Sequence, residues 1–252
     1  MGVLPLQGQR PLGLLAGLLI CAGLGWWFLA WALADMSRPF AQLMMPMTAV
    51  WTGDNLVAAF IMWTVMMAAM MLPSSMPMIL TFAKLDERNP TPGRCVVFTA
   101  AYLTLWTVFS VGAVLAQWAL QAKGLTSPMM VSVSPWLSAA LLVSAGVFQF
   151  TPFKQACLRR CRSPMGFLLT EWREGTLGAW RMGLRHGSYC LGCCWALMAL
   201  LFVAGVMNLL WVGTLAIFVA AEKLLPWGHR LSHAAGVAMV VTGCCVALRV
   251  AV

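Results

Sequence analysis

An imidazole and three thiols lie within nine residues of one apolar stretch of the chain, from His186 to Cys194. On a helix with 100° per residue, His186, Cys190 and Cys193 fall on one face, within about 60° of arc. Cys194 lies on the flank of that face. Thiolates and an imidazole placed in this way can converge on a soft metal ion such as Cu(I). We therefore predict a metal site formed by the three thiols, with His186 as an auxiliary ligand. The alternative is that the cysteines pack as small hydrophobic residues.

Methionine is unusually frequent in the first third of the chain. The sequence holds 19 Met but only 4 Ile, and 11 of the Met lie between Met36 and Met78. A neutral thioether is a soft ligand that favours Cu(I), and it lies in a membrane without the cost of a buried charge. Packing of irregular gaps by a flexible side chain is the alternative explanation. On one helix, five of these residues form two stripes that predict a low-affinity path for a soft ion: Met62, Met66 and Met70 in one, Met67 and Met71 in the other.

Other ionisable groups lie in or beside apolar stretches. Glu222 falls one turn inside an expected span, and an intramembrane carboxylate is a functional candidate, so we assign it as a second auxiliary residue of the metal site. Lys223 is expected to extend its ammonium toward the membrane surface. Cys157 and Cys161 lie four residues apart in an arginine-rich stretch that favours thiolate. This pair is an independent candidate for function, with simple packing as the alternative.

Two prolines four residues apart, Pro73 and Pro77, follow the methionine stripes. Each removes a backbone donor and clashes with a preceding carbonyl, so we expect the helix to kink or unwind around Ser74 and Ser75. Carbonyls freed at membrane depth must face protein or a hydrated cavity. A broken helix beside clustered methionines suits a small-ion site, although a simple kink is the commoner explanation.

The elements that carry these groups are predicted to be membrane-spanning helices. Of the 252 residues, 62% are hydrophobic and only 9% are charged, which leaves too little polar surface for a soluble enzyme domain. The apolar blocks do not alternate with polar residues, which excludes a barrel. We expect an all-α fold, a polytopic transmembrane helical bundle in which residues 1–252 form a single domain. Seven spans are predicted, at about 12–34, 56–80, 96–119, 136–152, 190–206, 209–225 and 234–250.

The basic residues predict the orientation of this bundle. With seven spans, 13 Lys and Arg lie on the side of the N-terminus and three lie on the other side. This positive-inside bias places the N-terminus in the cytoplasm. The net charge of +9 therefore indicates topology and anionic lipid, and no nucleic acid is expected. The long connection at 153–189 is expected to lie as an amphipathic helix in the cytoplasmic headgroup plane. Ala32-Leu33-Ala34 has the small-x-small form of a signal-peptidase site, but the apolar run is long enough for a retained span.

Three sequence blocks in this order resemble the bacterial family of predicted metal-binding integral membrane proteins. The resemblance covers most of the chain, and it implies a multi-span inner-membrane protein of the copper-chaperone kind that handles copper. It supports the metal site without supplying a mechanism. Cys157 and Cys161 are not part of it. The blocks are Met67–Pro73 with Pro77 and Met78, then Cys190–Trp195 running on to Gly205–Leu209, and last Glu222–Pro226.

Together these features predict a protein that binds Cu(I) and either transports the ion or delivers it to a partner. The partner would be a metallochaperone or a copper enzyme under assembly. No phosphorylation loop or phosphate-binding glycine motif is present in the sequence, so no ATP-driven step is expected. An enzymatic alternative is a membrane thiol-disulfide oxidoreductase that uses Cys190 and Cys193, whose spacing suits reversible disulfide chemistry. The cytoplasmic side expected for these thiols is reducing and disfavours it. A third alternative is a non-catalytic assembly scaffold.

Overall fold

A computed structural model of the protein describes residues 9–35, 37–46, 50–86, 93–127 and 130–251. Within these ranges the chain is helical, and two isolated β-bridges, Thr126 with Ser132 and Val131 with Ala204, are the only extended pairings. The all-α prediction is confirmed. The helices are α1 (Gln9–Leu33), α2 (Pro39–Met44), α3 (Gly53–Asp86), α4 (Arg94–Ala122), α5 (Pro135–Phe148), α6 (Pro152–Arg162), α7 (Pro164–Glu171), α8 (Gly175–Ala199), α9 (Leu201–Ala204), α10 (Leu209–Leu224) and α11 (Gly228–Ala251).

Five helices in the described ranges are long and apolar enough to cross a membrane. They match five of the seven predicted spans, and α8 continues through α9 as one stretch. A multi-pass membrane protein is therefore supported by the lengths and compositions of the helices themselves. The five stretches are Leu12–Leu33, Gly53–Asp86, Arg94–Ala122, Gly175–Ala204 and Gly228–Arg249.

The other two predicted spans, 136–152 and 209–225, correspond to shorter helices. α5 has 14 residues and α10 has 16, which gives about 21 Å and about 24 Å of helix, less than a bilayer core of about 30 Å. α5 is long enough to cross a membrane only when α6 is counted with it as one broken span, and the two helices are bent by 64°. The bend arises because Thr151 and Pro152 start a new helix: the Thr151 hydroxyl accepts a hydrogen bond from the Lys154 amide at 3.3 Å.

The connection at 153–189 differs from the single surface helix that was predicted. It contains α6, α7 and the first half of α8, and α8 runs on without a break into the stretch that carries the cysteines. The break before α8 lies at Gly175, whose φ of +74° suits glycine better than other residues. Irregular alternation of Leu, Trp and Arg suggests one helix, but Pro164 at the start of α7 and the break before Gly175 divide the segment.

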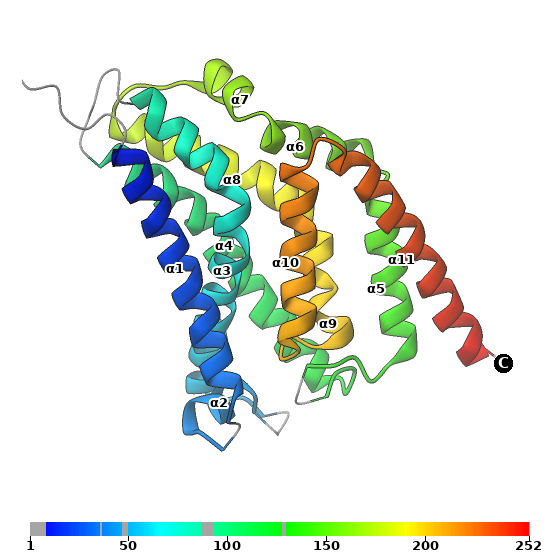
Figure 1. Ribbon diagram of the computed structural model, residues 1–252. Helices are drawn as coiled ribbons and strands as arrows, with labels where there is room; N and C mark the ends of the chain where they lie inside the picture. Colours follow the sequence, from blue (N-terminus) through cyan, green and yellow to red (C-terminus); the bar gives the residue numbers. More distant parts are fainter. Residues whose placement is uncertain (1–8, 36, 47–49, 87–92, 128–129, 252) are drawn as a thin grey trace, which may run out of the picture.

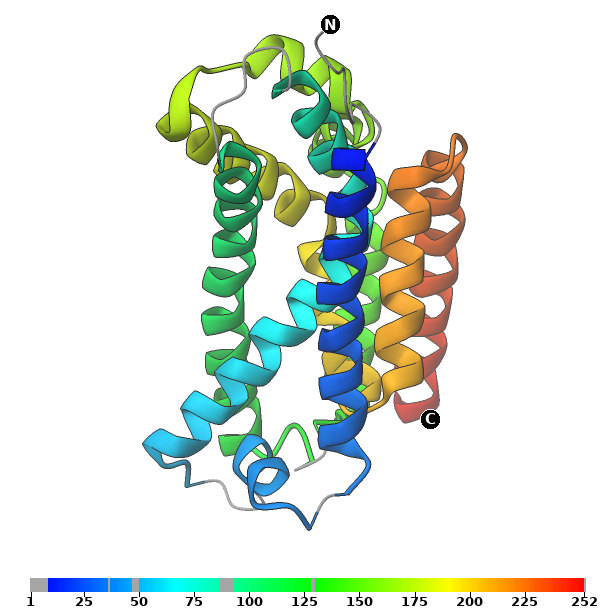
Figure 2. The same cartoon turned by 60° about the vertical axis from the view of Figure 1, so that its left-hand side comes forward.

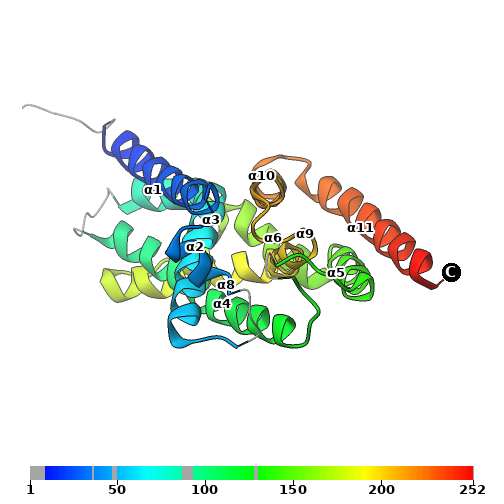
Figure 3. The same cartoon turned by 90° about the horizontal axis from the view of Figure 1, so that it is seen from below.

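Cysteine-bearing α8 occupies the middle of the bundle. It packs against α4 and α6, while α1 packs on α3 at one edge and α11 packs on α5 at the other (Figure 3). α1 begins at the end of the bundle that carries α6 and α7, and the chain terminates at the opposite end (Figures 1 and 2).

Close helix contacts occur at glycines. A Cβ added to Gly25 of α1 would lie 2.9 Å from the Cβ of Ala69 in α3, and one added to Gly183 of α8 would lie 2.8 Å from the Cβ of Ala101 in α4. These distances are shorter than real Cβ contacts, so the absence of a side chain is what allows the approach. The second contact fixes α8 against α4 and thereby places the cysteines.

α3 passes through its two prolines without unwinding. The helix is continuous from Gly53 to Asp86, and the hydroxyls of Ser74 and Ser75 donate to the carbonyls of Met71 and Leu72 at 3.0 and 2.9 Å. Of the two predicted alternatives, a kink or unwinding, the continuous helix excludes unwinding. Both serine hydroxyls are therefore bonded back along the helix and do not face an open cavity.

Candidate metal centre

The predicted inner site lies in the core of the bundle. Cys190, Cys193 and Cys194 are each at most 2% exposed, and all three lie on the buried face of α8. The thiols of Cys193 and Cys194 both donate to the carbonyl oxygen of Cys190, at 3.1 and 3.0 Å. The helical spacing thus placed three thiols together as predicted. All nine cysteines of the chain are free thiols.

A fourth thiol joins this cluster from α6. The Cys161 thiol lies near the thiols of Cys190 and Cys193, in the same buried cluster where α6 packs on α8. Cys157, one turn earlier on α6, lies against α8, where a Cβ added to Gly192 would be 2.9 Å from its sulfur. Gly192 therefore leaves the space in which α6 docks. We define the thiol cluster as Cys161, Cys190, Cys193 and Cys194.

An ammonium group and a phenol border the thiol cluster. Lys223 of α10 is 7% exposed and donates to the sulfur of Cys190 and to the hydroxyl of Ser74, both at 3.0 Å. The hydroxyl of Tyr102, on α4, lies 3.1 Å from the same sulfur and 3.3 Å from the carbonyl of Met71. Helices α3, α4, α6, α8 and α10 therefore meet around Cys190. The prediction that Lys223 extends toward the membrane surface is wrong, because acceptors for its ammonium are available inside.

The predicted methionine path is buried along α3. Its five members are at most 2% exposed, and they belong to the same contiguous apolar core as the thiol cluster. The end of the path is next to the thiols, because Tyr102 bridges the backbone of Met71 to the sulfur of Cys190. No sulfur of this path faces the lipid. The five are Met62 (2%), Met66 (1%), Met67 (0%), Met70 (1%) and Met71 (0%).

Glu222, the predicted auxiliary carboxylate, is engaged in a buried ion pair. Its two carboxylate oxygens accept hydrogen bonds from the Lys154 ammonium at 2.8 and 2.9 Å, and the two side chains are 2% and 0% exposed. The same ammonium donates to the side-chain oxygen of Gln149, which also accepts from Ser232 at 2.9 Å. The pair joins α6 to α10, the helices that supply Cys161 and Lys223.

His186, the predicted auxiliary imidazole, lies one turn before Cys190 and is 2% exposed. Its ring stacks on that of Tyr102 with 5.3 Å between centroids, and Phe98 and Phe167 are its other ring neighbours. Nδ1 of His186 makes no hydrogen bond. A buried imidazole nitrogen without a partner is rare, and it is free to accept a metal ion or a proton donor.

The thiol cluster does not have the arrangement of a formed metal site. In the ranges that the structure describes, no group of three or more His, Cys, Asp or Glu side chains is arranged to hold a metal ion. The geometry gives the reason, since the thiols of Cys193 and Cys194 are turned onto a backbone carbonyl. Rotation about χ1 would release them, a change between staggered rotamers.

Sequence reasoning assigned neither Tyr102 nor Lys223 to the site. Both contact Cys190 across large sequence separations, 88 and 33 residues, which no local pattern reports. One signal was available for Lys223, because a lysine one turn inside an apolar stretch needs an acceptor if it does not reach water. For Cys161 the signal was its four-residue spacing from Cys157.

Comparison with known proteins identifies one family. The model of PpoB2, described as a copper chaperone family, matches residues 60–246, which include every predicted ligand and the whole thiol cluster. No curated protein and no solved structure matches the chain.

Proposed function

This chain belongs to the PpoB2 copper chaperone family, and on that premise we propose that it binds Cu(I) in the membrane at the thiol cluster. The proposed protein then moves the ion across the membrane or delivers it to a copper enzyme or a metallochaperone. The observation that carries this proposal is the convergence of four buried thiols from α6 and α8 beside one buried ammonium. Thiolates are the protein ligands that select Cu(I).

Lys223 gives the cluster its charge balance in this proposal. A buried ammonium requires a partner of opposite charge, and the nearest sulfur, that of Cys190, is 3.0 Å away. Cys190 as a thiolate would meet that need and would present an anionic ligand in an otherwise apolar core. A Cu(I) ion bound there by further thiolates would form an anionic centre, which the same ammonium would stabilise.

The auxiliary residues take separate roles. His186 offers the unpaired Nδ1 one turn from Cys190 and is proposed as an additional ligand. Glu222 is proposed to act through Lys154, because the ion pair that they form holds α6 and α10 together and so positions Cys161 and Lys223. Removal of such a supporting contact costs about 10–100-fold in metal affinity at known metal sites.

The methionines of α3 are proposed as the path by which the ion reaches the thiols. Thioethers bind Cu(I) without a charge and hence more weakly than thiolates, which suits transfer better than storage. We further propose that the chain spans a bacterial inner membrane seven times with a cytoplasmic N-terminus, with the short helices α5 and α10 completing the count. The thiol cluster would then lie toward the cytoplasmic side.

Metal analysis of the purified protein tests the proposal. Protein expressed with added copper and purified anaerobically in detergent should retain copper in stoichiometric amount, with an X-ray absorption edge of Cu(I) and sulfur scatterers. Protein free of any metal under these conditions would contradict copper binding. A trapped mixed disulfide through Cys190 or Cys193 in metal-free protein would support the oxidoreductase alternative instead.

Substitution of the methionine path by leucine should slow copper uptake without abolishing it. The five changes Met62→Leu, Met66→Leu, Met67→Leu, Met70→Leu and Met71→Leu nearly conserve volume, so the fold should persist. The thiol cluster remains, so the final copper content should equal that of the wild type. The rate at which proteoliposomes acquire Cu(I) should fall by about tenfold if each ion passes the soft ligands.

A matched control for this variant removes methionines elsewhere. Met165→Leu combined with Met239→Leu leaves α3 unchanged and should keep the wild-type rate. Equal rates for the wild type and the variant with five leucines would exclude the methionine path while leaving the thiol site untouched.

A further inference from the structure

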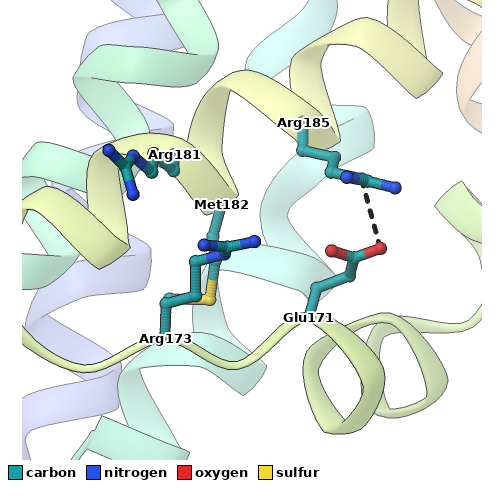
Figure 4. Close-up of a pocket in the computed structure, with 5 residues that line it drawn as sticks. All are labelled: Glu171, Arg173, Arg181, Met182 and Arg185. Carbon is teal, nitrogen blue, oxygen red and sulfur yellow. Dashed lines mark ion pairs between the residues drawn. The ribbon is translucent and has the colours of Figure 1, made fainter.

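A pocket lined by three arginines opens at the junction of α7 and α8. It has a volume of about 350 Å³ and is formed by Glu171, Arg173, Arg181, Met182 and Arg185 (Figure 4). Its elements lie at the end of the bundle where α1 begins (Figures 1 and 2). We infer that this arginine pocket binds the phosphate group of an anionic phospholipid. This inference does not depend on copper binding.

The charges of the pocket favour an anion. Arg185 forms an ion pair with Glu171, with 3.1 Å between Nε and Oε1. Neither Arg173 nor Arg181 has an ion-pair partner among the described residues. Three guanidinium groups against one carboxylate leave two positive charges around a single hollow. Guanidinium groups bind phosphate oxygens through paired, charge-assisted hydrogen bonds, so this arrangement suits a phosphate group.

The backbone that carries Arg173 is fixed by a buried contact. Arg94 is 1% exposed, pairs with Asp86 at 2.6 Å and donates to the carbonyl of Arg173 at 2.8 Å. The guanidinium of Arg94 also lies over the ring of Trp172, 5.1 Å from its centroid. The first turn of α8 lies close to this segment, since a Cβ on Gly178 would be 2.6 Å from the same carbonyl. The pocket is therefore held in shape by the protein before any ligand binds.

Exposed apolar side chains beside the pocket indicate a lipid as the source of the phosphate. Leu177 is 63% exposed and precedes Arg181 by one turn on the same face of α8, and Leu169 of α7 is 72% exposed two residues before Glu171. Met165 on α7 is also exposed. Apolar neighbours do not stabilise a bound free phosphate ion, whereas they do stabilise the acyl chains of a bound lipid. Basic pockets between helices at the cytoplasmic side of membrane proteins are suited to anionic headgroups.

Lipid binding to the full-length protein in neutral detergent tests the inference. The probes are short-chain phosphatidylglycerol, short-chain phosphatidylcholine and inorganic phosphate, and binding is measured by native mass spectrometry and by titration. Wild-type protein should bind phosphatidylglycerol in preference to the other two. Arg173→Gln combined with Arg181→Gln should weaken this binding by about tenfold or more, because each guanidinium–phosphate contact contributes a charge-assisted hydrogen bond.

Two further variants separate the pocket from a general basic surface. Arg159→Gln combined with Arg230→Gln removes the same number of exposed arginines from α6 and α11 and should leave binding unchanged. Glu171→Gln removes the competing carboxylate and frees Arg185, so it should tighten binding a few-fold, a gain that misfolded protein does not show.

Three results would overturn the inference. One is an equal loss in the pocket variant and in the arginine control. Another is weaker binding in Glu171→Gln. The third is inorganic phosphate binding as tightly as phosphatidylglycerol, which would make the pocket a site for a free anion.

Discussion

Replacement of Cys190, Cys193 and Cys194 together by serine is expected to remove copper from the purified protein. Serine nearly conserves the shape of cysteine but replaces a soft sulfur by a hard hydroxyl oxygen, which Cu(I) binds poorly. Loss of an outer-shell partner costs about 10–100-fold in metal affinity, so loss of three direct ligands should cost more than that. Copper content by elemental analysis after anaerobic purification, and competition with a Cu(I) chelator, measure the loss.

A control with the same number of substitutions is available in this chain. Cys21, Cys244 and Cys245 are exposed on α1 and α11, away from the core. The triple variant Cys21→Ser, Cys244→Ser, Cys245→Ser should retain copper as the wild type does. Equal copper content in the wild type, the α8 triple variant and this control would exclude the thiol cluster as the copper site. Loss in both variants would indicate that the copper is bound by thiols without regard to position.

Cys161→Ser distinguishes a four-thiol site from one confined to α8. If the Cys161 thiol is a ligand, this single change should lower Cu(I) affinity to a value between those of the wild type and of the α8 triple variant. Cys157→Ser is the matched control, because its sulfur faces Gly192 of α8. Both variants keep α6 amphipathic, so the fold should be preserved.

The sequence was sufficient to place the thiols of α8 together because they are related by helical periodicity alone. Positions 186, 190 and 193 must share a face on any helix, and the structure buries all three. The same argument held for the methionine stripes of α3, which are buried in the core and do not face lipid. Both results rest on local geometry.

Contacts between distant segments could not be obtained in this way. The position of Cys161 beside Cys190 depends on how α6 folds back after the bend at Thr151. The contact between the Lys223 ammonium and the Cys190 sulfur depends on where α10 packs. Hydropathy also cannot locate helix ends, since the expected fourth span, 136–152, extends past the end of α5 at Phe148 to the first residue of α6, Pro152. A capping threonine followed by proline was the local signal for that start.

Glu222→Gln is expected to destabilise the protein more than any other single change considered for the site. The substitution keeps the size of the side chain but leaves the Lys154 ammonium, at 0% exposure, without an anion. Removal of one partner of a buried ion pair typically costs about 3–5 kcal/mol, because the other charge stays buried. The free energy of unfolding, measured by chemical denaturation in detergent micelles, should fall by about this amount.

A second variant separates the loss of the pair from the loss of a buried charge. Lys154→Met combined with Glu222→Leu replaces both partners by apolar side chains of similar volume, and such replacements are often neutral or stabilising. We expect this double variant to unfold near the wild-type midpoint and to retain copper, because apolar packing of the two new side chains would hold α6 against α10 in place of the ion pair, and neither residue is proposed to touch the ion. Wild-type stability in Glu222→Gln would show that Lys154 finds another partner. Lost copper in a stable double variant would show that metal binding needs the ion pair itself or one of its two members, and that apolar packing of α6 on α10 does not replace it.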